Sequence, residues 1–450
     1  MEEKAETDHH HHCLITIKEV EEMEERIKET PKLLNQTAGK ESCCIFRVPQ
    51  SLVEINKKAY HPRILSIGPY HHGKPHLNMI EEHKWKFLGE LLARTPPTGL
   101  KLDGYLKLVA SMENRIRDCY SEFIHFTSFD LVKMMVLDGL FIIELISKTL
   151  SVAPSDPDDP IFNMAWIFTF LGRDLLRLEN QIPFFVLQTL FENTRVTRSC
   201  GADRSLAKLI LGFFNYMMER PDGVLERFGN LEGKHLLDFF RLSFIPPPPP
   251  QQKPRRIGED ELLELIPSAK KLGAAGIEFK PKKGDTVLAI RFHNGVLEIP
   301  HISIDDFITA FLLNSVAFEQ CYSHCPKHMT AYATFMGCLI NNPSDAEFLC
   351  EQKIVENYFG TADDLTHFFN NLGKEVSFDI GNNYLSNVFV DVNEYSRNGW
   401  HVRWAELKDT YFNSPWSFIS ALAASILLLL TMIQAFFAVY PFAGGKPFGS

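Results

Sequence analysis

The sequence lacks the short motifs by which common catalytic sites are recognised. It contains no H-E-x-x-H metalloprotease motif, no G-x-S-x-G nucleophile elbow and no G-x-G-x-x-G dinucleotide-binding loop. Residues 229–235 come nearest to a phosphate-binding loop, but they have one spacer residue too few and no Ser or Thr to bind magnesium. We therefore expect no catalytic residue, no cofactor-binding residue, no metal-binding residue and no cofactor, and an enzyme is the less favoured class.

The sequence also lacks an excess of basic residues. Lys and Arg together number 46 against 56 for Asp and Glu, which gives a formal net charge of −10 over 450 residues. A nucleic-acid-binding protein needs a basic face that displaces counterions from phosphates, so the charge argues against nucleic acid as a partner. Hydrophobic residues make up 45% and charged residues 23% of the chain, which is typical of a globular protein.

Neither a secretory signal nor a disulfide framework is found. The first residues, MEEKAETDHHHHC, are acidic and polar, with no apolar segment before a small-residue cleavage site. The nine cysteines are odd in number and irregularly spaced. We therefore expect reduced thiols in a protein that does not enter the secretory pathway through an N-terminal signal.

One long uncharged run lies near the C-terminus. No residue from Trp416 to Tyr440 is charged, and about 20 apolar residues suffice to cross a hydrocarbon layer of ~30 Å. Trp416 and Tyr440 stand where amphipathic rings favour the membrane interface. The run predicts a transmembrane helix over 413–441, a short tail at 442–450 and a lipid bilayer as one partner.

Basic residues flank this run unequally. Arg397, Arg403 and Lys408 precede it, whereas only Lys446 follows it. The positive-inside rule then predicts a single-pass protein of the plasma membrane or an endomembrane, with its large domain in the cytosol. In that orientation the glycosylation sequon at Asn35 would stay unmodified.

The rest of the chain has the apolar spacing of helices, with one hairpin. Asn-Gly at 294–295, between apolar runs at 287–292 and 296–299, is a strong hairpin signal. We expect a mainly α, multi-helical globular domain with a small β-hairpin, plus the C-terminal transmembrane helix. The expected divisions are a polar N-terminal tail with an exposed helix at 1–42 and one domain at 43–412. A Pro-rich loop at 244–256 is interpreted as a solvated linker in preference to a docking site.

Two segments hold polar residues that fit an active site or a buried structural network. His71 and His72 follow a Gly-Pro-Tyr turn, and Glu179, Asn180 and Gln181 interrupt an apolar run. Buried polar groups must find partners, so we favour a structural role for both segments. The alternative is an unrecognised enzyme in which His71, His72 and Glu179 converge on a pocket, within ~4 Å of each other.

A Cys-His run offers a possible zinc site. Cys321, His324, Cys325 and His328 are residue types that bind zinc, and on a helix they would share one face. However, Pro326 interrupts that helix, and four ligands within so short a segment would crowd one ion. We favour ordinary thiols at a helix end.

In their order along the chain, several segments resemble the plant family known as domain of unknown function 247 or uncharacterised protein family 0481. The matching segments are 45–49 (IFRVP), 66–73 (SIGPYHHG), 134–139 (MMVLDG), 174–191 with LENQIPFF, 297–300 (LEIP) and 317–320 (AFEQ). The residues of these motifs to which we assign a structural role are Gly68, Pro69, Tyr70, His71, His72, Gly73, Asp138, Glu179, Asn180, Gln181, Pro183 and Glu319.

The resemblance implies a largely helical plant protein that is anchored by its C-terminal helix and has no established enzyme activity. Some family members in grasses are associated with self-incompatibility, as candidate male determinants of pollen recognition. From the resemblance and the missing catalytic motifs we expect an interaction or recognition module with an unidentified protein partner.

Overall fold

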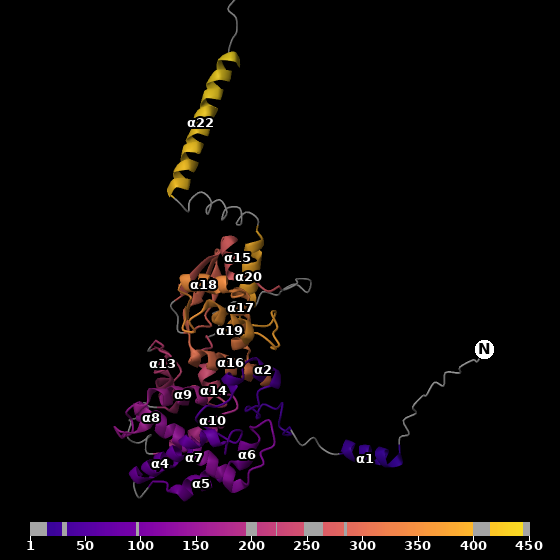
Figure 1. Cartoon of the computed structure of the whole chain (residues 1–450), viewed down its shortest axis with the longest axis vertical. Helices are drawn as coiled ribbons and strands as arrows, with labels where there is room; N and C mark the ends of the chain where they lie inside the picture. The colour runs from indigo at the N-terminus through magenta and orange to yellow at the C-terminus, as the bar shows by residue number, and fades with distance from the viewer. Residues whose placement is uncertain are drawn as a thin grey trace, which may run out of the picture.

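Helices dominate the computed structural model of the chain (Figure 1). The structure describes residues 16–28, 34–95, 99–194, 205–221, 223–246, 264–282, 286–398 and 415–443. The prediction of a mainly helical protein with a few strands is confirmed. An N-terminal half and a C-terminal half follow one another along the long axis of the body, in indigo to magenta and in orange (Figure 1).

The N-terminal half is built around α7 (Ser128–Thr149), whose side chains are almost all buried. The helix begins where the Thr127 side chain accepts a hydrogen bond from the backbone N–H of Asp130, which satisfies one of the free donors of the first turn. The other helices of this half are α2 (Gln50–Ile55), α3 (Lys57–Tyr60), α4 (Asn78–Arg94), α5 (Leu102–Ala110), α6 (Glu113–Arg117), α8 (Pro160–Asn163), α9 (Ala165–Leu175), α10 (Phe184–Glu192), α12 (Leu206–Asn215), α13 (Gly223–Arg227) and α14 (Leu236–Leu242), with a 3-10 turn η1 (Pro75–Leu77). Because few of its residues are charged, α7 can be covered by other helices, and α4, α5, α10 and α12 all pack against it.

The C-terminal half combines helices with two small sheets. Its helices are α15 (Ala269–Ala274), α16 (Asp306–Cys321), α17 (His328–Leu339), α18 (Pro343–Glu351), α19 (Ala362–Leu372) and α20 (Ser386–Arg397). In the first sheet β3 (Val296–Pro300) lies between β1 (Glu278–Lys282), which is parallel to it, and β2 (Arg291–His293), which is antiparallel. The second sheet pairs β4 (Ile302–Ile304) with β5 (Val355–Asn357) in parallel.

The predicted hairpin is confirmed as β2 and β3. Asn294 and Gly295 both have positive φ angles, of 51° and 80°, which is the backbone conformation that a tight Asn-Gly turn requires. The strand before the turn is shorter than expected, because residues 287–290 form a turn and an irregular segment. Residues 264–268 are irregular, and α15 begins at Ala269.

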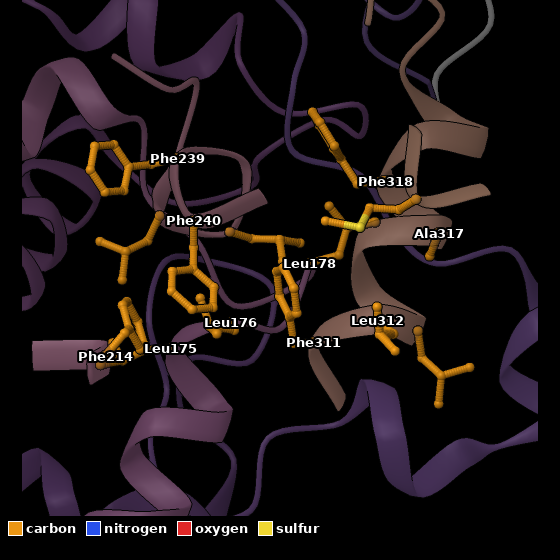
Figure 2. Packing of buried hydrophobic residues seen from close by; sticks show 14 of the residues in the cluster. Leu175, Leu176, Leu178, Phe214, Phe239, Phe240, Phe311, Leu312, Ala317 and Phe318 are labelled. Carbon is orange, nitrogen blue, oxygen red and sulfur yellow. The ribbon is translucent and has the colours of Figure 1, made fainter. Parts of the chain in front are cut away.

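Phenylalanine side chains join the two halves. Phe214 of α12, Phe239 and Phe240 of α14, and Phe311 and Phe318 of α16 gather in one buried cluster with leucines of 175–178 (Figure 2). The Phe240 ring lies 4.7 Å from that of Phe214 and 4.9 Å from that of Phe311. Edge-to-face and tilted pairs at such distances add to the stabilisation from area burial. The core is therefore continuous between α14 and α16.

The prediction of a transmembrane helix at 413–441 is wrong. Residues Pro415–Ala443 form a helix, α22. Among the residues that the structure describes, however, no helix is both long enough and apolar enough to cross a membrane.

Three further predictions depended on that helix and are wrong with it. They are the transmembrane element of the fold class, the lipid bilayer as a partner, and the single-pass membrane location with the large domain in the cytosol. The side chains of Trp416 and Tyr440, predicted for the membrane interface, lie outside the described residues, as does most of the Pro-rich loop. The division at 1–42 and 43–412 stays a prediction.

Candidate functional site

The polar residues of the 174–181 segment bind the backbone of the 63–68 segment. Asn180 accepts a hydrogen bond from the N–H of Ile67 at 2.7 Å and donates one to the carbonyl of Leu65 at 3.0 Å. Asp174 accepts from three consecutive backbone N–H groups, those of residues 63–65, at 2.8–3.0 Å. We call this set of contacts the buried clamp. It satisfies backbone groups that neither a helix nor a sheet would satisfy.

Gly68 lies at the centre of the clamp, where only glycine fits. Its φ is +71°, and a Cβ atom there would lie 2.4 Å from the carbonyl oxygen of Gln181. Its N–H donates to Asp138 at 2.7 Å, and Asp138 also accepts from the buried Lys84 at 2.6 Å. Gln181 donates to two carbonyls at the end of α9 and accepts from the N–H of Leu237 at 3.1 Å.

The remaining motif residues make further buried or turn contacts. Pro183 stands at the N-cap of α10, and Gly73 has a φ of +79° in the turn after His72. The Tyr70 hydroxyl donates to the carbonyl of Ile45 at 3.3 Å. Glu319 is wholly buried, where it binds Arg241 at 3.0 Å and the N–H of Thr330 at 2.8 Å. Burial raises the pKa of Glu319, and Arg241 opposes that shift.

Glu179 and His71 meet at the edge of the clamp. Glu179 binds Arg47 at 2.9 Å and the N–H of Val48 at 2.9 Å, and its Oε2 lies 3.1 Å from Nε2 of His71. Lys74 lies 2.7 Å from Nδ1 of His71. An ammonium can only donate, so Nδ1 accepts and the ring proton of neutral His71 sits on Nε2, facing Glu179.

The electrostatics fix the charges of this pair. Burial raises the pKa of Glu179, but His71, the Val48 N–H and Arg47 outweigh it and bring the pKa to about 2. Burial lowers the pKa of His71 below its usual value, against the opposing pull of Glu179. Near neutral pH the pair is a carboxylate beside a neutral imidazole.

The predicted convergence of His71, His72 and Glu179 is met only in part. His72 packs edge-on against Phe126, with ring centroids 5.6 Å apart, and has no recorded contact with the other two. The side chain of His71 is fully buried and that of Glu179 is 8% exposed. The neighbouring cavity of about 300 Å³ is lined by Arg47, Pro69, Tyr70 and residues 122–126, and neither His71 nor Glu179 lines it.

The four residues of the Cys-His run point to different neighbours. His324 lies 3.0 Å from the carbonyl of Gly39, and His328 stacks on Tyr384. Cys321 and Cys325 are free thiols. Within the described part of the chain, no three side chains of His, Cys, Asp or Glu come together as a metal site.

A second candidate site lies where the two halves meet. A cleft of about 720 Å³ is lined by α3, the end of α9, α16 and α19 together with adjoining loop residues. Its cationic residues are Lys58, Arg63, Arg173 and Arg177, and its apolar wall includes Phe170 and Phe359. We call it the basic groove.

A smaller cavity of about 390 Å³ adjoins the basic groove. The two share Arg173, Asp306 and Phe359 as lining residues. Tyr216 and Tyr358 line the smaller cavity and are 66% and 65% exposed. The two cavities therefore form one depression, with Tyr216 and Tyr358 at the smaller cavity and Lys58, Arg63 and Arg177 at the larger one.

The arginines of the basic groove differ in how far they are paired. Arg177 donates to Asp174 at 2.8 Å and to the carbonyls of Lys58 and Ala59. Arg173 forms an ion pair with Asp306 at 2.9 Å, while its buried Nε has no hydrogen-bond partner among the described residues. Burial lowers the pKa of Arg177, and the nearby charges of Arg63 and Arg173 lower it further.

The sequence comparisons place these sites within one family. A family model described as a plant protein of unknown function (DUF247) matches residues 45–430, which is most of the chain. This chain belongs to the DUF247 family. It is 39% identical over 435 residues to a UPF0481 protein of Arabidopsis thaliana, an alignment that covers 92% of this chain and 90% of the relative.

A second UPF0481 protein of Arabidopsis thaliana is 24% identical over 485 residues, covering 88% of this DUF247 chain and 90% of that relative. No solved structure matches the chain. The predicted family membership is thus confirmed. The association with self-incompatibility, which is implied by some grass members, stays a prediction for this DUF247 protein. All residues of the buried clamp and the basic groove lie within the matched region.

Sequence reasoning singled out polar residues in both segments of the buried clamp of this DUF247 protein, but it predicted neither the role of Asp174 nor the hydrogen bonds of the clamp, and it missed the basic groove. Its lining residues come from near 58, 173, 306 and 359, and none of them stands in an unusual string. One local signal was present, because Arg173 and Arg177 are two cationic residues only four positions apart near the end of an apolar helix.

Proposed function

We propose that this DUF247 protein is an interaction module that binds a segment of a partner protein in the basic groove and the adjoining cavity, with no catalytic step of its own. The observation that carries the proposal is the composition of this depression. Tyr216 and Tyr358 are mostly exposed at one end of it, beside Arg173. Tyrosine, tryptophan and arginine are enriched among the few residues that carry most of the binding energy at protein interfaces.

The shape of the depression supports a peptide-like occupant. The larger cavity alone has the volume of a typical ligand site, and Arg173 and Phe359 continue its wall into the second cavity. Beside the depression, Trp166 is 48% exposed and packs edge-on against Phe170. An extended segment that lies along both cavities would cover these rings, which are otherwise in contact with water.

The pKa shifts and contacts of Glu179 and His71 support the part of the proposal that assigns the protein no catalytic step. A general base works best with a pKa near the working pH. The pKa of Glu179 is about 2, and burial lowers the pKa of His71 below its usual value, so both shifts move away from the pKa that suits a general base near neutral pH. Arg47 and the Val48 N–H also occupy the carboxylate oxygens that a substrate would have to reach.

A peptide selection tests the proposal. The full chain is screened against a display library of short random peptides, and the selected peptides are labelled for fluorescence anisotropy. We expect Tyr216→Ala and Tyr358→Ala each to weaken binding by about 30-fold, the usual cost of about 2 kcal/mol for truncating an interface hot spot. Phe129→Ala is the matched control, because Phe129 is 65% exposed on α7 and does not line the depression.

Two results would contradict the proposal. One is a failure to select any binding peptide. The other is a set of peptides whose affinity falls as much with Phe129→Ala as with the two tyrosine variants. Circular dichroism of each variant checks that the fold is kept, which we expect because all three side chains are mostly exposed.

A further inference from the structure

The basic groove carries a local excess of positive charge on a protein with a net charge of −10. Four cationic residues line it, against the two carboxylates of Asp306 and Asp364. Asp364 is itself engaged at the start of α19, where it binds the hydroxyl of Thr361 at 2.5 Å. The groove is therefore a basic surface on an acidic molecule.

Much of this positive charge is not neutralised from within the protein. The side chains of Lys58 and Arg63 are exposed and form no hydrogen bond or ion pair with any residue that the structure describes. Arg173 is held by Asp306 through one nitrogen only, and that carboxylate is 67% exposed. A guanidinium has five N–H donors, arranged in a fork that suits a carboxylate. Because the Arg63 side chain uses none of them within the described residues and Arg173 uses one nitrogen for Asp306, most of these donors remain free to bind a ligand.

Neighbouring arginines also repel one another across the groove. Arg63 and Arg173 are close enough to Arg177 to disfavour its charged form. An anion placed among them would remove that repulsion and would be attracted by all three at once. The low exposure of Arg173, 19% for its side chain, lessens the screening of such a contact by water.

We propose that the partner segment is acidic and that its Asp or Glu side chains bind Arg63, Lys58 and the free donors of Arg173 in the basic groove. This inference rests on the proposed function and adds the chemical class of the partner. A carboxylate is favoured as the anionic group because carboxylates already meet the guanidinium groups of this site, Asp306 at Arg173 and Asp174 at Arg177. The apolar wall formed by Ile55, Leu313 and Phe368 suits hydrophobic residues that alternate with the acidic ones.

The peptides selected for the tyrosine end provide the probe. We expect them to be enriched in Asp and Glu, and we expect a version of the tightest peptide with every acidic residue changed to its amide to bind at least about tenfold more weakly. Raising the NaCl concentration from about 50 to about 500 mM should weaken the acidic peptide and leave the amide version nearly unchanged, because salt screens charge–charge attraction.

Charge reversal in the protein gives the matching half of the test. Arg63→Glu should weaken the acidic peptide by at least about tenfold and should not weaken the amide version. Arg291→Glu is the control, because Arg291 is an exposed arginine on β2 that does not line the groove. The side chain of Arg63 has no partner among the described residues, so its replacement should not unfold the protein.

The outcomes separate this inference from the proposed function. Peptides that respond to Tyr216→Ala and Tyr358→Ala, but bind equally well as amides, would overturn the acidic partner and leave the interaction module standing. A labelled peptide of residues 16–28, the acidic helix α1 (Ile17–Lys28) with its exposed Ile17 and Ile27, is measured in parallel by the same anisotropy assay. Binding of that peptide without any selected from the library would assign the groove to the protein's own helix and overturn the partner segment.

Discussion

The buried clamp and the basic groove lie next to each other but differ in whether their polar side chains have partners within the protein. In the clamp, Asn180 and Asp174 each have several hydrogen-bond partners, and backbone N–H groups take up the carboxylate charge. In the groove, Arg63 and Lys58 are exposed without a partner among the described residues. Satisfied buried networks are typical of structural sites, whereas unpaired charges at a cleft are typical of binding sites. The contrast supports the proposal that one region stabilises the fold and the other binds a partner.

The largest expected effect comes from removing the carboxylate of the clamp. Asp174→Ala leaves three backbone N–H groups unsatisfied and the buried Arg177 without its counter-charge. Breaking a buried ion pair from one side costs about 3–5 kcal/mol. Urea unfolding followed by circular dichroism should show a loss of that size, and Asp103→Ala, at an exposed i,i+4 pair on α5, should change the free energy of unfolding by less than about 0.5 kcal/mol. A small loss for Asp174→Ala would mean that the clamp does not hold the 63–65 backbone.

Acid should reveal the contribution of Glu179. Its pKa is about 2 in the folded protein, below the ordinary value of 4.5, so the folded state favours the carboxylate. The resulting stability, about 3 kcal/mol at one pKa unit per ~1.4 kcal/mol, is present above pH 4.5 and is lost as the pH falls toward 2. Urea unfolding at several pH values should show this loss. In Glu179→Gln the free energy of unfolding should fall less steeply between those pH values, because Glu179 no longer titrates while the other acidic groups titrate as before. An unchanged slope would contradict the assignment.

Two glycines with positive φ angles allow the cost of steric crowding to be separated from the cost of backbone strain. Gly68 and Gly39 both have positive φ, but a Cβ at Gly68 would meet the Gln181 carbonyl whereas a Cβ at Gly39 would meet nothing within 4 Å. Gly39→Ala should cost about 1 kcal/mol for strain alone, and Gly68→Ala should cost at least about 2 kcal/mol because a close contact is added. Thermal unfolding measures both. Equal losses of stability in the two variants would mean that the backbone at Gln181 moves to make room for the added methyl group.

The smallest effect on stability is expected in the groove. Arg63→Gln should change the free energy of unfolding by less than about 0.5 kcal/mol, because the side chain is exposed and has no partner among the described residues. Thermal unfolding of this variant beside Asp174→Ala compares the two regions directly. A destabilisation of Arg63→Gln by more than about 1 kcal/mol would show that Arg63 has a structural role and would remove the contrast on which the groove was assigned.

The clamp was predictable because its residues are close together in two short strings. Glu179, Asn180 and Gln181 interrupt an apolar run, and a polar group in such a run must be buried with partners. Which partners they find was not predictable, since the bond from Asn180 to Ile67 joins residues more than a hundred positions apart. The Asn294-Gly295 hairpin was predictable for the same local reason, whereas the parallel pairing of β1 with β3 depends on the packing of both strands.

The groove and the C-terminal helix show where sequence reasoning failed. Arg63 and Asp306 are ordinary in their local contexts, and only the packing of α3, α9 and α16 brings them to one cleft. At the C-terminus, the uncharged run predicted a transmembrane helix, but the described residues hold no helix of the required length and apolarity.

Asp174 connects the buried clamp to the basic groove, because it binds residues of both. One of its oxygens holds the backbone of residues 63–65, and the other accepts the hydrogen bond from Arg177, whose guanidinium lines the groove. A ligand carboxylate that draws Arg177 toward itself competes with Asp174, while one that stays on Arg63 and Arg173 leaves that bond intact. The deeper contact therefore loses part of its binding free energy to the broken Asp174–Arg177 bond, so its affinity is lower, and at equal concentration its complex melts at a lower temperature.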